Sequence, residues 1–171
     1  MMMDRGIVGW GDIVPETREL LMMEKDVFDG SYNRQWPMAG AKLSVELISQ
    51  SARALKFYLD IIENKRATTL IVGLAPDRKC TMQHRRSDRP LLRVDYATNA
   101  EMLRHRNPDG SMIVGPHVHL DVGNEGIHWA FPLAAQSVVI PEQDGVPALF
   151  WAFQEACRIT KLLRVEQSLG V

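Results

Sequence analysis

Histidine side chains are concentrated in one short stretch of the chain, RHRNPDGSMIVGPHVHLD, which runs from Arg104 to Asp121. Three of the five histidines lie in it, namely His105, His117 and His119. An imidazole titrates near neutral pH, so a pair of histidines can act as a general acid and a general base, and histidine is also a common metal ligand. This stretch therefore holds the residues that are best suited to chemistry.

The HVH segment has the spacing that places two imidazoles on the same side of a β-strand. Side chains alternate between the two faces of a strand, so His117 and His119 share one face, and Asp121 joins them if the strand continues. Val118 and Leu120 then point the other way, as core residues do. The pattern predicts a half-buried strand whose polar face carries the histidines.

A second segment, PLLRVDYA, is predicted to be a strand with two charged residues on one face, Arg93 and Asp95. If the two strands lie close together in a sheet, the histidines, the arginine and the carboxylate gather on one surface. We therefore predict that His117 and His119 are the catalytic residues, with His105 as a third. Asp95 is expected to orient one of these partners.

The region around these strands is rich in positive charge, although the formal net charge of the whole chain is −1. Residues 78–106 hold eight basic residues against three acidic ones, and this segregation creates a local positive field. Arginine binds phosphate oxygens through paired hydrogen bonds, so such a surface suits nucleic acid. The residues that we predict to bind substrate are Arg93, Asp95, Arg85, Arg104, Arg106 and Asn107.

Three kinds of site fit these residues. In the first, His117 and His119 bind zinc or iron together with one further histidine or carboxylate. In the second, the histidines are acid and base for cleavage of an RNA phosphodiester, and arginines stabilise the charge without a metal. In the third, the surface only binds nucleic acid or an acidic protein. The second uses more of the observed features, so we expect neither a metal nor a cofactor. The candidates for the further metal ligand are His105, Asp121, Glu125 and His128.

The rest of the chain predicts an α+β fold, in which an antiparallel meander sheet is flanked by an N-terminal and a C-terminal helix. Residues 12–30 and 144–170 have the apolar spacing and the early proline that are typical of helices. No linker or repeat divides the chain, so we predict a single domain over residues 1–171. The strands are predicted at 41–49, 55–62, 90–97, 112–122 and 127–134, with a further hairpin over 68–86.

The composition is that of a globular protein, with 46% apolar and 24% charged residues. No apolar run is long enough for a membrane span, and the N-terminus lacks the features of a signal peptide. We therefore expect a cytoplasmic protein with no membrane contact. Cys80 and Cys157 lie among apolar neighbours, and we expect both to be reduced and at least partly buried.

Four motifs are spread over residues 90–133. Through these motifs the chain resembles a family of small bacterial and phage proteins that is classed as a domain of unknown function. The resemblance implies that His105, Arg106, Asn107, His117 and His119 belong to one site. It fits two roles, a toxin-like nuclease or an inhibitor of a host or defence protein. The chain departs from the usual form by a longer insert, YATNAEML, ahead of the histidine stretch. The motifs are Leu92 to Asp95, His105 to Gly110, Pro116 to His119 and Trp129 to Leu133.

These observations together predict a protein that handles nucleic acid, RNA in preference to DNA, as a metal-independent ribonuclease of toxin type. The alternative is a non-catalytic protein from a phage or mobile element. In that case the same surface, or another, binds and inhibits a host or defence protein such as a CRISPR effector.

Overall fold

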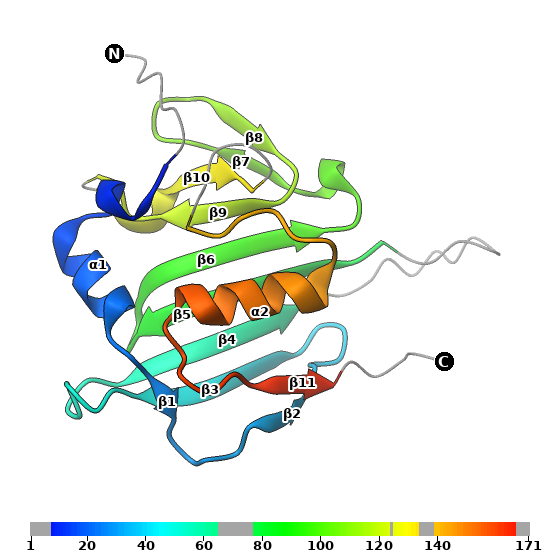
Figure 1. Cartoon of the computed structure of the whole chain (residues 1–171). Helices are drawn as coiled ribbons and strands as arrows, with labels where there is room; N and C mark the ends of the chain where they lie inside the picture. Colours follow the sequence, from blue (N-terminus) through cyan, green and yellow to red (C-terminus); the bar gives the residue numbers. More distant parts are fainter. Residues whose placement is uncertain (1–7, 65–76, 124, 134–138, 167–171) are drawn as a thin grey trace.

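A seven-stranded antiparallel sheet forms the centre of the molecule, in the strand order β1-β3-β4-β5-β6-β9-β10 (Figure 1). The computed structural model describes residues 8–64, 77–123, 125–133 and 139–166. The α+β class and the antiparallel sheet that the sequence predicts are confirmed. The strands of this sheet are β1 (Asp26–Val27), β3 (Lys42–Ile48), β4 (Phe57–Glu63), β5 (Lys79–Arg86), β6 (Arg89–Ala97), β9 (His117–Leu120) and β10 (Trp129–Pro132).

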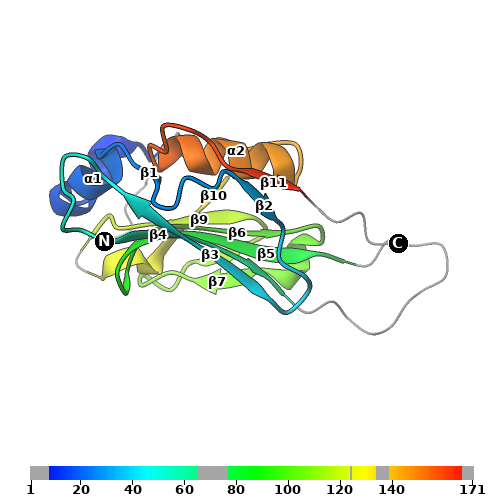
Figure 2. The same ribbon diagram turned by 90° about the horizontal axis from the view of Figure 1, so that it is seen from below.

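Two helices, α1 (Pro15–Met22) and α2 (Val146–Ala156), cover one face of the sheet (Figures 1 and 2). Each has a proline in its first turn, where the missing N–H costs no hydrogen bond. Burial of Leu21 from α1 and of Phe153 from α2 fixes the helices on the sheet. None of the helices in the described part of the chain has the length and the apolar composition that a membrane crossing requires.

A small hairpin lies against the opposite face of the sheet, where Figure 2 shows β7 on the side away from both helices. It consists of β7 (Arg104–Arg106) and β8 (Met112–Val114), which pair antiparallel. The remaining elements are the short helices η1 (Trp10–Asp12), η2 (Ala100–Met102) and η3 (Gly126–His128), and the parallel strand pair β2 (Asn33–Gln35) and β11 (Arg164–Glu166).

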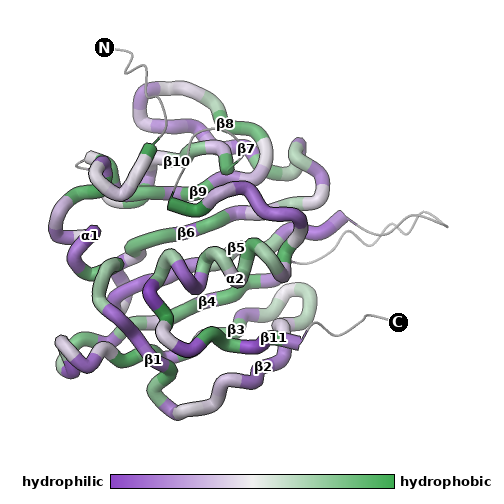
Figure 3. The backbone as a smooth tube through the Cα atoms, viewed as in Figure 1, coloured by the Kyte–Doolittle hydropathy of each residue, from purple (hydrophilic) through white to green (hydrophobic). Residues whose placement is uncertain are grey.

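The two faces of the sheet differ in chemistry because side chains alternate along each strand. Across neighbouring strands, Ile61, Met82, Val94 and Val118 stand in one row of register, and all are fully buried under the helices. The strands of Figure 3 accordingly carry both hydrophobic and hydrophilic segments. The row on the opposite, polar face consists of Ser44, Asp60, Gln83, Arg93 and His119.

The N-terminal helix is shorter than the predicted range of 12–30. It ends at Met22, and residues 26–27 form strand β1 instead. The cause is Lys25, whose side chain is 1% exposed and whose Nζ donates to the carbonyls of Leu21, Met23 and Cys157 at 2.7–3.2 Å. These bonds hold the chain in an extended path that pairs β1 with β3. Burial lowers the pKa of Lys25 to about 8.

The C-terminal helix also ends early, at Ala156. Arg158 has a φ of 57°, which breaks the helix, and the side chain of Gln154 bonds both backbone groups of Leu163. The chain then returns as β11 to pair with β2.

The predicted strand at 112–122 is interrupted at Gly115 and becomes β8 and β9. The first arm of the hairpin predicted over 68–86 lies outside the described residues, and its second arm is β5.

Cys80 and Cys157 are both buried, as expected, and are not joined by a disulfide. One histidine, His84, belongs to the core rather than to the polar face. It is fully buried, its ring stacks on Phe57, and its Nδ1 donates to the carbonyl of Tyr58. Its Nε2 has no hydrogen-bond partner among the described residues. Burial lowers the pKa of His84 to about 3, because the protonated ring loses its hydration in the interior.

We expect the buried ring of His84 to make stability depend on pH. Its pKa is depressed in the folded state, so the unfolded chain binds more protons between about pH 6.5 and about pH 3. The free energy of unfolding therefore decreases as the pH is lowered through this window. In His84→Leu this contribution is absent, and the free-energy difference between the two proteins should change by roughly 2 kcal/mol from pH 6.5 to pH 4.5.

Urea unfolding at both pH values measures this change. The loss of the bond to Tyr58 shifts the variant equally at both, so only the difference between them counts. The exposed His128, changed to alanine, is the control and should follow the wild type. A constant offset between wild type and His84→Leu at both pH values would contradict the prediction.

Candidate functional site

Two neighbouring strands bring the predicted residues together on the polar face of the sheet. β6 and β9 pair antiparallel, with Arg93 opposite His119 and Asp95 opposite His117. Val118 is fully buried on the other face, as the alternation predicts. The two histidines and Asp95 are themselves 2–6% exposed, because the β7–β8 hairpin covers this end of the polar face.

One carboxylate oxygen of Asp95 faces both imidazoles. The Nε2 atom of His119 lies 3.0 Å from Oδ2 of Asp95, and the Nε2 atom of His117 lies 3.5 Å from the same oxygen. The Nδ1 atoms of the two rings point to backbone carbonyls, of Gly115 at 2.7 Å and of Ile127 at 3.1 Å. Since a carbonyl only accepts, each Nδ1 carries a proton and donates it.

Gly115 allows this arrangement. Its φ of 100° lies in the left-handed region that favours glycine, and this turn aims its carbonyl at the ring of His117. Its own N–H donates to the carbonyl of Leu103, which links the turn to the start of the hairpin. The break between β8 and β9 therefore serves to orient an imidazole.

The second oxygen of Asp95 is held by two other side chains. The hydroxyl of Thr81 donates to Oδ1 at 2.5 Å, and the guanidinium of Arg93 donates to it at 3.0 and 3.2 Å. Burial by itself raises the pKa of Asp95, but hydrogen bonds from the two histidines, the charge of Arg93 and the bond from Thr81 outweigh it and lower the pKa far below its usual range. Asp95 is therefore ionised.

The pKa of His119 is lowered by burial, although its bond to Asp95 acts in the opposite direction. Both ring nitrogens of His119 are engaged, one by a carbonyl and one by the carboxylate. The ring therefore has no free nitrogen to exchange a proton with a substrate while this network is intact.

The hairpin folds His105 onto the same site. Its ring centroid lies 4.7 Å from that of His119 and 5.8 Å from that of His117. Its Nε2 donates to the backbone carbonyl of His128 at 2.7 Å, so Nδ1 keeps a lone pair. One cluster thus contains His105 from the hairpin and His117 and His119 from the HVH segment, and we call it the histidine cluster.

Asn107 explains why the hairpin lies where it does. Its side-chain amide donates to the carbonyl of Ala130 at 3.1 Å, and its Oδ1 accepts from the N–H of Ala130 at 2.8 Å. Asn107 is buried and fixes the hairpin to β10. We predicted it to bind substrate, but in the structure its polar atoms bind the backbone and Ser111 instead.

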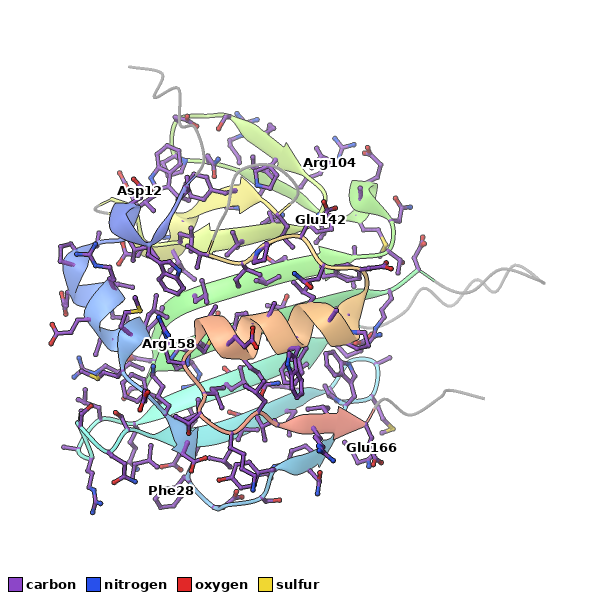
Figure 4. All side chains as sticks on the ribbon, in the orientation of Figure 1. Asp12, Phe28, Arg104, Glu142, Arg158 and Glu166 are labelled. Atoms are coloured by element: carbon purple, nitrogen blue, oxygen red, sulfur yellow. The ribbon has the colours of Figure 1, made fainter. Side chains whose placement is uncertain are left out.

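A cavity of about 410 Å³ opens over the histidine cluster. Lys79, Arg93 and Arg104 line it together with the polar side chain of Gln83, and Asp95 is its one acidic lining residue among those described. Arg104, which is labelled in Figure 4, sits on β7 and forms an ion pair with Glu101. The lining of the cavity is therefore predominantly basic.

Two of the predicted arginines lie apart from this cavity. Arg85 binds Asp60 at 2.7 Å and stacks on Tyr58. Arg106 is exposed on the hairpin and does not line the cavity. Of the other suggested metal ligands, Asp121 accepts a hydrogen bond from Thr17, and Glu125 accepts one from the indole of Trp129.

Sequence reasoning missed Thr81 and Lys79. Both stand on β5, in register with Asp95 and Ala97 of β6. The alternation of β5 is visible in the sequence and would place Thr81 on the face of Asp95, once the pairing of the two strands is known. Within the described residues, Asp95, His117 and His119 form the cluster whose ligand atoms are close enough for one metal ion.

We expect removal of the Asn107 amide to loosen the hairpin. Asn107→Ala leaves the N–H and carbonyl of Ala130 without their partner, at a cost of about 1–3 kcal/mol. Denaturant unfolding measures the loss, and hydrogen exchange of β7 and β8 should become faster. Asn33→Ala, at an exposed position on β2, should change stability by less than about 0.5 kcal/mol. Equal losses in both variants would refute the anchoring role.

Comparison with known proteins agrees with the resemblance noted in the sequence. No curated protein and no solved structure matches the chain. One family model does match, over residues 15–159, which include both helices, all seven strands of the sheet and the whole histidine cluster. The chain therefore belongs to the family of unknown function DUF6978.

Proposed function

We propose that this protein binds RNA at the basic cavity and cleaves it there, as a cytoplasmic ribonuclease of toxin type. The single observation that supports the proposal is the composition of the cavity. It combines three cationic side chains with the three imidazoles of the histidine cluster, in a space of about 410 Å³ on the polar face of the sheet.

The cationic side chains suit a phosphodiester. Lys79, Arg93 and Arg104 come from three different strands and surround the cavity. A phosphate group brings negative charge and oxygen acceptors, which arginine binds with paired hydrogen bonds. Arg93 is already oriented by Asp95, and its side chain is still 40% exposed. It can therefore bind a phosphate oxygen without leaving the carboxylate.

In this proposal, proton transfer belongs first to His105. Its ring lines the cavity, is partly exposed, and keeps a lone pair at Nδ1 because Nε2 donates to His128. Such a ring can take the proton of a ribose 2′-hydroxyl, which DNA lacks. The 2′-oxygen then bonds to phosphorus as the bond from phosphorus to the 5′-oxygen breaks, and water protonates the leaving 5′-oxygen. We expected His117 and His119 to be the acid and base, but their nitrogens face carbonyls and Asp95. In this arrangement His119 orients Asp95, which in turn holds Arg93.

The proposal is tested by binding and cleavage of a fluorescent single-stranded RNA, with DNA of the same sequence beside it. Arg104→Ala should weaken RNA binding about tenfold and reduce the dependence of binding on salt by about one phosphate contact. Arg53→Ala is the matched control, because Arg53 and Arg104 are both exposed and each bonds a side chain three residues earlier. The partner is Gln50 for Arg53 and Glu101 for Arg104. Arg53→Ala should bind as the wild type does.

His105→Ala should reduce the rate of RNA cleavage by about 10²–10⁴-fold with little change in binding. His128→Ala, which also removes an imidazole from the cavity wall but leaves the backbone carbonyl, should cleave normally. Expression of the wild type, but not of His105→Ala, should slow growth. Absence of RNA binding by the folded wild type would refute the proposal. A stable protein complex that survives these substitutions would favour the inhibitor instead.

A further inference from the structure

We infer that Asp95, His117 and His119 bind one divalent transition-metal ion, with Zn²⁺ as the expected type. The inference concerns binding at the floor of the cavity and does not depend on whether the protein cleaves RNA. It differs from our expectation from sequence, which was a site without a metal.

Two of the three separations between the ligand atoms are close to those of a zinc site. One ligand atom from each of the three residues lies within 4.8 Å of the others. Two ligands that are each about 2.0–2.1 Å from a tetrahedral Zn²⁺ lie about 3.3–3.4 Å from one another. The separations of Oδ2 of Asp95 from the Nε2 atoms of His119 and His117, 3.0 and 3.5 Å, lie on either side of this value.

The protonation of the rings points the same way. Because Gly115 and Ile127 take the Nδ1 protons, a neutral ring of His117 or His119 has a lone pair at Nε2. Each Nε2 then faces Oδ2 of Asp95 either through a proton, as a hydrogen bond to the carboxylate, or through a lone pair that can bind a cation. A proton between His119 and Asp95 makes one of these contacts, whereas a single cation can bind both rings and the carboxylate.

The surrounding bonds have the pattern of a metal site. Metal-bound histidines commonly donate their other N–H to a backbone carbonyl, and metal-bound carboxylates are themselves hydrogen-bonded. Here both Nδ1 atoms donate to carbonyls, and Oδ1 of Asp95 is held by Thr81 and Arg93. Oδ2 is thus left as a single, oriented ligand atom. These bonds fix all three groups before any ion arrives.

The set of ligands selects the kind of ion. Two imidazoles and one carboxylate suit Zn²⁺ or Fe²⁺, whereas Mg²⁺ and Ca²⁺ prefer oxygen ligands. Three protein ligands also leave a position open, as in catalytic zinc sites. The cavity lies above this position, and the ring of His105 stands beside it, with its centroid 4.7 Å from that of His119.

The experiment is a metal titration of the full-length chain after treatment with a chelator, without RNA. Zn²⁺ binding is followed by calorimetry, and Co²⁺ binding by visible absorption, which reports the number of ligands. We expect one ion per chain, a higher melting temperature with Zn²⁺, and no comparable effect of Mg²⁺. Folded wild-type protein that takes up neither Zn²⁺ nor Co²⁺ would overturn the inference.

Variants locate the ion. Asp95→Asn and His119→Gln should weaken Zn²⁺ binding by more than about a hundredfold, and Thr81→Val, which only loses the bond to Asp95, by about 10–100-fold. His128→Ala is the matched control, because it removes an imidazole from the same cavity and should bind Zn²⁺ as the wild type does. Loss of binding in His128→Ala, with Asp95→Asn and His119→Gln unaffected, would place the ion elsewhere.

Circular dichroism checks that each variant is folded, and the wild-type titration decides the question where a variant is not. The outcome is separable from that of the RNA experiments. Stoichiometric Zn²⁺ without RNA binding would leave the metal site standing and remove the proposed function, and RNA binding by a protein that takes up no metal would do the reverse.

Discussion

The carboxylate of Asp95 is the group around which this molecule is organised. It is ionised, it is only 4% exposed, and it takes hydrogen bonds or close approaches from side chains on both neighbouring strands. A buried charge is stable only when its partners are fixed. The groups that fix these partners include Thr81 on β5, the carbonyl of Gly115, and the hairpin that lies over this end of the sheet.

Strand alternation was enough to predict much of the site. The spacing of His117, Val118 and His119 separates imidazoles from core, and the same rule places Arg93 beside Asp95 on the polar face. It also predicts the overall class, because the five segments predicted as strands alternate or are rich in branched residues, which favours a sheet. Alternation is a local property of the backbone, so it can be read without knowledge of the rest of the fold.

What could not be predicted depends on contacts between distant residues. The position of His105 over the sheet is set by the amide of Asn107 and the backbone of Ala130, which are 23 residues apart. The early ends of both helices are set by Lys25, which reaches the carbonyl of Cys157, and by Gln154. In each case a polar side chain forms hydrogen bonds with backbone groups of another segment. The periodicity of apolar residues in the sequence does not indicate such bonds.

The contact between Asn107 and Ala130 has a consequence for the whole sheet. β10 is the last strand of the sheet, and a last strand normally presents free N–H and carbonyl groups to other chains. At Ala130 an asparagine side chain, which carries the same amide chemistry as a peptide bond, occupies both groups. At Ala130 the edge therefore offers no free backbone group to a second molecule, and the contact that places the hairpin over the histidines also shortens the open edge of the sheet.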